Sequence, residues 1–234
     1  MRYLLFIPTF NEVGNIELLL RSITADYPYL DILIVDDNST DGTIESISRL
    51  NFSQLMLIVR PSKLGIGSAH ILALNFARKN NYDFLITMDG DGAHQPVLIK
   101  EFLDKSSRYD LVIGSRYLVN NSLIEWSIIR KVLTHSIHLI TKLSLNLKYD
   151  NSSAFRCYRI KHMPESLFSS LQSTGYDFFF ESLFNLNKYR LLRITEIPIY
   201  LPARIYGNSK LTLKLAIKAS KTLLSLIIKR LLIK

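Results

Sequence analysis

The chain has 234 residues, of which 48% are hydrophobic, and it carries a formal net charge of +9. This length and apolar content suit one sizeable domain with a real core. Cys157 is the only cysteine, which excludes an intrachain disulfide and favours a reducing compartment. The N-terminus lacks the features of a secretory signal, and no window offers the roughly 18 apolar residues in a row that a spanning helix needs, so we expect a soluble chain. The positive charge predicts an anionic partner and leaves nucleic acid, phospholipid and phosphorylated metabolites open.

In chain order, short apolar runs alternate with helical patterns. The runs span residues 2–8, 31–37, 54–59, 83–89 and 110–115, and the helical patterns between them span 15–25, 43–50, a stretch ending near 80, and 97–105. Strands that alternate with helices predict βαβ units, hence an α/β fold with a mostly parallel central sheet and flanking helices. Ligands of such sheets bind beyond the carboxyl ends of the strands. Polar clusters follow every predicted strand, so we expect a site at this rim.

The run LITMDGDGAHQP ends on two carboxylates, Asp89 and Asp91. A calcium EF-hand loop does not fit, because its positions five, six and twelve would be Ala93, His94 and Lys100. An ordinary turn is the alternative, since Asp and Gly are common turn residues. Two acids at the end of a buried strand instead favour a hard divalent ion, Mg²⁺ or Mn²⁺, which oxygen ligands hold together with substrate phosphates.

The segment VDDNSTDGT (35–43) follows the second apolar run. Ser39 or Asp41 is a candidate N-cap of the next helix. Asp36 and Asp37 come straight off the strand, where carboxylates suit hydrogen bonds to the base or ribose of a nucleotide. Residues 60–70 lack the P-loop pattern, and no G-x-G-x-x-G follows the first run. A P-loop NTPase and a dehydrogenase are therefore not expected.

Eight segments, taken in order, resemble those of one family. They are PTFNE (8–12), VDDNSTDGT (35–43), KLGIGSAH (63–70), MDGDGAHQP (88–96), GSRY (114–117), DNSSAFRCYR (150–159), GYDFFFE (175–181) and EIPIYLPARIYGNSKL (196–211). The family is the inverting family-two glycosyltransferases of GT-A fold, with the dolichol- and polyprenyl-phosphate mannose synthases as the most similar members. The resemblance implies a Rossmann-like GT-A catalytic domain over residues 1–210, followed by a C-terminal helix over 211–234.

On the donor side, the resemblance implies contacts to a nucleotide sugar. The segment that borders the base is matched by Pro8, Phe10 and Glu12. Asp36 matches the carboxylate that contacts the nucleoside, with Asp37 beside it. Asp89 and Asp91 match the D-x-D pair that binds ribose and the divalent metal on the diphosphate, which gives Asp91 a part in catalysis as well.

On the acceptor side, Arg116 and Arg130 match basic residues that face an acceptor phosphate, and Arg204 and Lys210 belong to a segment that closes over the phosphates. A polyprenyl phosphate is already an anionic nucleophile, so it needs positioning by such cations more than deprotonation. Glu181 is the one candidate base in the second half of the chain, and the alternative is that it orients an arginine.

Some positions depart from the family pattern. Gly90 replaces an alanine, and Ala93 stands where a polar residue that can contact the metal is common. Ala154 replaces a glycine, and Ala203 replaces an acid. These changes suggest a divergent member of the family and weaken the assignment of mannose as the sugar. His94 is expected to shape the turn before the following proline, with a ligand role as the alternative.

The C-terminal segment has lysines at helical spacing, Lys214, Lys218 and Lys221, among leucines and isoleucines, and it has no acid. This pattern predicts a basic amphipathic helix that lies in a membrane interface. The alternative is a helix that packs on its own core or on a second subunit. Residues 126–147 combine a tryptophan with many aliphatic side chains and are a candidate second membrane surface.

We therefore expect a metal-dependent inverting transferase that moves a hexose, with GDP-mannose as the favoured donor, to a polyprenyl or dolichyl phosphate. It would act in the cytoplasm, peripherally on the cytosolic face of a membrane. One alternative is a UDP-sugar-dependent enzyme of surface polysaccharide or glycolipid synthesis, which would need a base. A rival from another class is a non-catalytic basic protein that binds membrane or nucleic acid. Acids at the rim argue against nucleic acid, because they would repel phosphate unless a metal intervened.

Overall fold

The computed structural model describes residues 1–120, 122–123, 126–189, 191–202 and 213–232. Within them, seven strands form one sheet in the order β3-β2-β1-β4-β6-β5-β7. The predicted strands are confirmed as β1 (Tyr3–Thr9), β2 (Asp31–Asp36), β3 (Leu55–Val59), β4 (Phe84–Thr87) and β5 (Leu111–Ser115). β1 pairs in parallel with β2 and β4, and β2 pairs in parallel with β3. The reversal of strand order at β1 and β4 creates the crevice where ligands of open α/β sheets bind.

Two further strands lie outside the sequence prediction. β6 (Arg156–Arg159) is antiparallel to both β4 and β5, and β7 (Ile194–Pro198) extends the sheet in parallel beside β5. β6 has an arginine at each end, so it does not show the apolar run of the other strands. It joins the sheet because the Arg156 side chain, although fully buried, donates to the carbonyl oxygens of Ser153 and Phe179.

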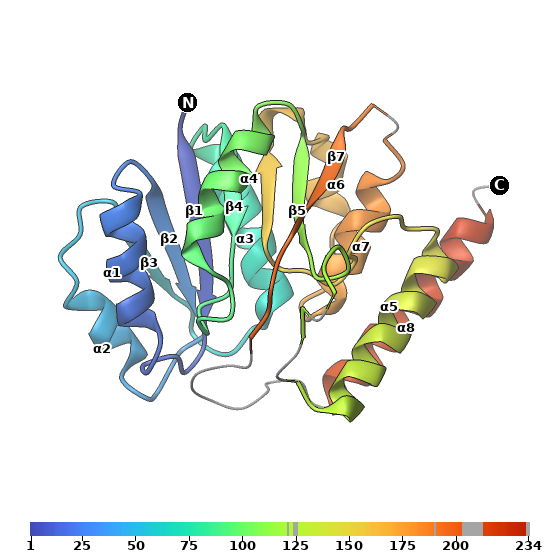
Figure 1. The fold of residues 1–234 in the computed structure, drawn as a ribbon, viewed down its shortest axis with the longest axis horizontal. Helices are drawn as coiled ribbons and strands as arrows, with labels where there is room; N and C mark the ends of the chain where they lie inside the picture. Colours follow the sequence, from blue (N-terminus) through green and yellow to red (C-terminus); the bar gives the residue numbers. More distant parts are fainter. Residues whose placement is uncertain (121, 124–125, 190, 203–212, 233–234) are drawn as a thin grey trace.

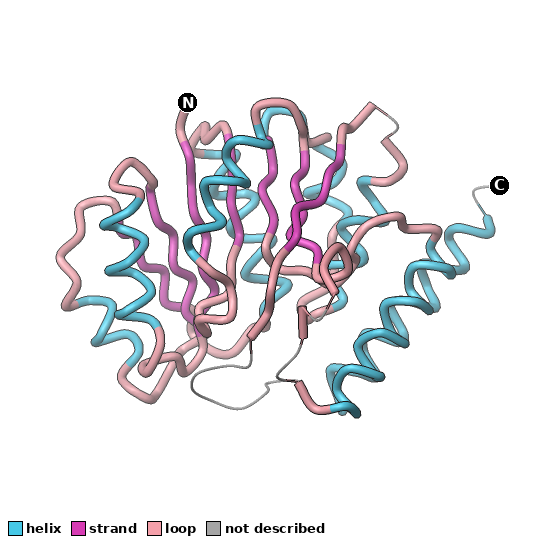
Figure 2. Tube along the Cα trace, in the orientation of Figure 1, coloured by secondary structure: helices cyan, strands magenta, loops and turns pink. Residues whose placement is uncertain are grey.

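Helices cover both faces of the sheet (Figures 1 and 2). One face carries α1 (Ile16–Asp26), α2 (Thr43–Ser48), η1 (Pro96–Leu98) and α4 (Ile99–Ser106), and the other carries α3 (Ile66–Lys79), η2 (Ile160–His162), α6 (Glu165–Ser170) and α7 (Asp177–Leu186). Because successive strand residues point to opposite faces, Leu4 and Phe6 join the core on one side, and Leu5 and Ile7 join the core on the other. Burial on both faces explains why the strands are almost wholly apolar.

α5 (Ile128–Leu145) and α8 (Leu213–Leu232) lie side by side outside this sandwich (Figure 1). The Arg230 guanidinium joins them by donating to the carbonyl oxygens of Leu143 and Ser144, at 3.1 and 2.6 Å. α8 also packs on α7 through the buried Leu226 and through Thr222, whose hydroxyl donates to Asp177 at 2.7 Å. One side of α8 thus packs on its own domain, as one of the two alternatives expected, and the other side is exposed; the membrane-interface alternative stays a prediction. In the described chain, no helix combines the length and apolarity needed to cross a membrane.

Candidate functional site

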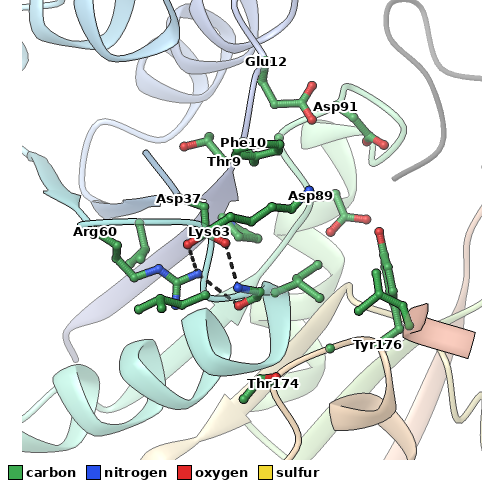
Figure 3. A pocket seen from close by; sticks show the side chains of 18 of the residues that line it. Thr9, Phe10, Glu12, Asp37, Arg60, Lys63, Asp89, Asp91, Thr174 and Tyr176 are labelled. Carbon is green, nitrogen blue, oxygen red and sulfur yellow. Dashed lines mark hydrogen bonds and ion pairs between the residues drawn. The ribbon is translucent and has the colours of Figure 1, made fainter. Parts of the chain in front are cut away.

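A cavity of about 470 Å³ opens at the carboxyl ends of β1, β2 and β4 (Figure 3). This volume lies in the range of small-molecule sites. The lining residues come from six segments of the chain. Those discussed below are Pro8, Phe10, Glu12, Asp37, Arg60, Lys63, Asp89, Asp91, Thr174, Tyr176 and Lys218. The rim predicted from the strand order is therefore the place where the structure has its cavity.

Of the two neighbouring acids at the end of β2, Asp36 and Asp37, only Asp37 lines the cavity. Asp36 is fully buried and accepts from the Thr9 hydroxyl at 2.6 Å and from the backbone and hydroxyl of Ser39, both at 2.7 Å. It holds the ends of β1 and β2 together. The resemblance assigned the nucleoside contact to Asp36, but Asp36 does not line the cavity, whereas its neighbour Asp37 does. Asp37 forms a buried ion pair with Arg60 and accepts from the Gly65 backbone N–H at 2.9 Å.

The D-x-D turn is held by hydrogen bonds of its own. The Asp91 carboxylate accepts from the Ala93 backbone N–H at 3.1 Å. The Asp89 backbone N–H donates to Nδ1 of His94 at 2.9 Å, and the His94 ring stacks on Phe155 with centroids 4.9 Å apart. Burial lowers the pKa of His94 to about 4, so the ring is neutral near pH 7 and Nδ1 is free to accept. His94 therefore shapes the turn, as expected, and its Nδ1 is occupied by the backbone.

The donor set fits a hard divalent ion. Asp89 and Asp91 both line the cavity and offer carboxylate oxygens, whereas Ala93 offers no side-chain ligand. Within the described residues, no cluster of three or more metal-ligating side chains occurs. Mg²⁺ and Mn²⁺ are commonly held by one or two carboxylates together with substrate phosphates and water, so two are sufficient.

Of the four predicted acceptor-side residues, the two that the structure describes lie outside the cavity lining. Arg116 is buried and paired with Asp150, with Nε 2.9 Å from the carboxylate. Arg130, in the first turn of α5, lies 3.5 Å above the Trp126 ring. Neither lines the cavity. Arg204 and Lys210 lie outside the described residues.

The carboxylate of Glu181 is occupied by hydrogen bonds from the backbone of a neighbouring segment. Its carboxylate is buried in α7 and accepts from the backbone N–H groups of Ser173 and Gln172, at 2.9 and 3.3 Å. It thereby shapes the segment 172–176, of which Thr174, Gly175 and Tyr176 line the cavity. The Tyr176 hydroxyl end points toward Asp89 across the cavity (Figure 3).

Sequence reasoning missed several cavity residues. Lys63 and Tyr176 fall inside the quoted segments 63–70 and 175–181, so a signal for them was present. Arg60 is not one of the missed residues, because it is the polar residue after the third predicted strand, at the rim where the site was expected. Lys218 carried no such signal, because the sequence pattern around it is that of an amphipathic helix.

Residues 5–167 match the sequence profile described as Glycosyl transferase family 2. The chain belongs to this family. The expected GT-A-like α/β fold and the expectation of a glycosyltransferase are thereby confirmed. Among its family relatives is the undecaprenyl-phosphate mannosyltransferase of Micrococcus luteus, 32% identical over 215 residues, covering 91% of this chain and 88% of the relative. Another is the polyprenol monophosphomannose synthase of Mycolicibacterium smegmatis, 29% identical over 216 residues, covering 90% of this chain and 81% of the relative.

Solved structures share the fold at low identity. Glucosyl-3-phosphoglycerate synthase from Mycobacterium tuberculosis, crystallised with Mn²⁺, UDP-glucose and phosphoglyceric acid, superposes with a TM-score of 0.69 at 17% identity, covering 97% of this chain and 79% of that one. Mannosyl-3-phosphoglycerate synthase from Rubrobacter xylanophilus has a TM-score of 0.69 at 17% identity, covering 99% of this chain and 74% of that one. Both structures share the GT-A-like fold over almost the whole of this chain.

Proposed function

We propose that this family 2 enzyme moves mannose from GDP-mannose to a polyprenyl phosphate at the cytosolic surface of a membrane, with Mg²⁺ or Mn²⁺ bound at the D-x-D turn. The observation that carries the proposal is the cavity that brings Asp37, Asp89 and Asp91 together at the switch point of the sheet. Two relatives that align over most of their length are named for mannosyl transfer and for polyprenol or undecaprenyl phosphate, which supports the sugar and the acceptor.

The donor occupies the cavity between β2 and β4. Asp37 faces the nucleoside, and its carboxylate, which is paired with Arg60, accepts hydrogen bonds from base or ribose donors. Pro8, Phe10 and Glu12 border the base in this arrangement. Asp89 and Asp91 hold the divalent ion on the diphosphate, and the bound ion supplies positive charge that stabilises the leaving nucleoside diphosphate.

The acceptor needs orientation and no base. A phosphate oxygen attacks the anomeric carbon while the nucleoside diphosphate departs, and no proton has to be removed. The environment of Glu181 agrees with this, because its carboxylate is engaged by two backbone amides. Arg130, at the first turn of α5, together with Arg204 and Lys210 are the proposed phosphate contacts. Arg116, which the ion pair with Asp150 holds in place, acts on the acceptor side as a positioning residue in this proposal.

Membrane contact is proposed through the α5/α8 apolar surface. It consists of the exposed side chains Ile128, Ile129, Val132, Ile137, Leu139, Ile140 and Leu143 of α5 and Ile217, Leu224, Ile228, Leu231 and Leu232 of α8. An exposed apolar area of this extent marks an interaction surface. Lysines at 218, 221 and 229 add positive charge along α8, and an apolar helix surface with basic residues suits an anionic lipid interface.

The test of donor and metal uses calorimetry on the full chain. We expect GDP-mannose to bind in the presence of Mn²⁺, and to bind weakly after metal removal or in Asp91→Asn. Asp104→Asn, at an exposed position of α4, is the matched control and should bind like wild type. Binding of UDP-glucose in place of GDP-mannose would overturn the proposed donor and favour the UDP-sugar alternative.

The acceptor and the surface need separate assays. Radiolabelled mannose should appear on polyprenyl phosphate in anionic vesicles. The double variant Ile129→Gln/Ile140→Gln should lose flotation with vesicles and keep its affinity for GDP-mannose, because both residues lie on the α5/α8 apolar surface, away from the cavity. Unchanged flotation would exclude that surface as the membrane contact.

A further inference from the structure

The helix that carries the exposed apolar surface also forms a wall of the donor cavity. Leu215 and Lys218, from the first two turns of α8, line the cavity together with residues at the ends of β1, β2 and β4. The position of this wall is determined by contacts further along the helix. Thr222 donates to the buried Asp177, and Leu226 is buried in the core beside α7. Lys218 is therefore held beside the cavity by the packing of α8.

The three cations among the described residues that line this cavity have different environments. The Arg60 guanidinium is paired with Asp37 and also donates to the Gly65 carbonyl oxygen at 3.0 Å. The Lys63 ammonium lies 3.9 Å from the centre of the Phe10 ring. The Lys218 ammonium donates to the hydroxyl of Thr174, a neutral partner that also lines the cavity. Within the described part of the chain, no carboxylate lies within ion-pair distance of Lys218.

An ammonium group has three donors, and one neutral hydroxyl satisfies only one of them. The cavity around it is lined by four acids, namely Glu12, Asp37, Asp89 and Asp91. A phosphate group that enters such a cavity meets repulsion from these carboxylates, which the divalent ion offsets only at the D-x-D turn. Lys218, on another wall of the cavity, offsets this repulsion away from the turn, and a lysine acts toward phosphate as a compact point charge.

We propose that Lys218 binds a phosphate oxygen of the ligand in this cavity, which makes α8 part of the substrate site as well as of the membrane surface. The inference rests on the proposed function, because it takes the ligand to be a phosphate ester. Two sources offer the same chemistry, the diphosphate of the nucleotide sugar and the monophosphate of the lipid acceptor. Lys218 is thus a binding residue, and its charge is the property that matters.

The variant Lys218→Gln tests the charge, Lys218→Arg retains it, and Lys221→Gln is the matched control. Lys221 is exposed on the same helix, three residues further on, and does not line the cavity. Lys218→Gln and Lys221→Gln remove the same charge from α8 and should weaken flotation with anionic vesicles equally. We measure the Kd of GDP-mannose with Mn²⁺ by calorimetry, and the KM of polyprenyl phosphate in neutral detergent micelles.

We expect Lys218→Gln to weaken one of these two constants about tenfold, equivalent to about 1.4 kcal/mol. A raised Kd identifies the donor diphosphate as the ligand, and a raised acceptor KM at unchanged donor Kd identifies the lipid phosphate. Lys218→Arg should stay close to wild type, and the Tm of all three variants should match wild type because position 218 is exposed.

Three outcomes would overturn the inference. The first is that Lys218→Gln changes neither constant. The second is that Lys221→Gln causes the same loss, which would show a general effect of charge on α8. The third is that Lys218→Arg is as defective as Lys218→Gln with a lowered Tm, which would show a packing role. If the wild-type protein binds no nucleotide sugar and transfers no mannose, the proposed function itself fails. This failure is distinguishable from failure of the Lys218 inference, because it appears in the wild type before any variant is compared.

Discussion

Gly67, the second residue of α3, packs against the backbone of the segment that borders the cavity. Its N–H donates to the Thr174 carbonyl oxygen at 2.9 Å. A methyl group in Gly67→Ala would lie 2.5 Å from the Ser173 carbonyl oxygen and 2.6 Å from that of Gly175. These atoms belong to the backbone, so they cannot rotate away as a side chain would. Either α3 or the segment 173–175 has to move by about 0.9 Å to reach the 3.4 Å of ordinary contact.

The cost follows from this geometry. Overpacking of a tight site costs about 1–3 kcal/mol. Stretching the Gly67 hydrogen bond lowers the free energy of unfolding by about 1 kcal/mol more. The better helix propensity of alanine raises it by about 1 kcal/mol. The net loss of unfolding free energy is about 1–3 kcal/mol, which for a chain of this size lowers Tm by about 3–10 °C. Because Thr174 and Gly175 line the cavity, the Kd of GDP-mannose should rise several-fold as well.

The assay combines thermal unfolding followed by circular dichroism with calorimetric titration of GDP-mannose. Gly90→Ala is the control, because the atoms nearest to its added methyl would be side-chain carbons of Ile7 and Thr9 and the Pro8 carbonyl oxygen at 3.2–3.3 Å, a much milder overlap than at Gly67. That variant should lose less Tm than Gly67→Ala. A Gly67→Ala protein with wild-type Tm and wild-type Kd would refute the argument, since it would show that α3 does not dock on this segment as closely as described.

Three further predictions concern the site. Glu181→Gln should lower Tm, because two backbone amides lose a charged acceptor. It should keep kcat within about tenfold of wild type, whereas loss of a general base costs about 10²–10⁴ in rate. A steady-state transfer assay distinguishes these two outcomes for kcat. EDTA should abolish binding of GDP-mannose, and added Mn²⁺ or Mg²⁺ should restore binding in wild type and not in Asp91→Asn. Binding of GDP-mannose that is unchanged by EDTA would contradict the metal site. Folding lowers the pKa of His94 to about 4 and that of His70 to about 3, mainly through burial, so the unfolded state binds the extra protons and stability should fall as pH drops from about 6.5 toward 4. His94→Phe keeps the ring and removes one of these groups, and urea midpoints across this pH range should fall less steeply than in wild type.

Much of the fold and the position of the cavity were predictable because they rest on local pattern. Five apolar runs became five strands, and the polar residues at their carboxyl ends met at one rim because parallel strands point the same way. The D-x-D turn after β4 was visible for the same reason. Family motifs added the roles, since each of them covers a few consecutive residues.

The assignment between neighbouring acids could not be made from the chain. Asp36 and Asp37 have the same chemistry and follow the same strand. Which one faces the cavity depends on where the strand ends and on the hydrogen bonds that Thr9 and Ser39 give to Asp36. Glu181 is similar, because only the packing of α7 shows that backbone amides occupy its carboxylate.

The sequence by itself thus determined the strand order along the chain, the acidic rim and the family, because these follow from side-chain periodicity and short consecutive motifs. Only the tertiary structure decided that β6 inserts antiparallel between β4 and β5, with the buried Arg156 donating to carbonyl oxygens. It alone placed Lys218 beside the donor cavity. Residues separated by more than a hundred positions meet there through helix packing, and no local pattern in a sequence records such a meeting.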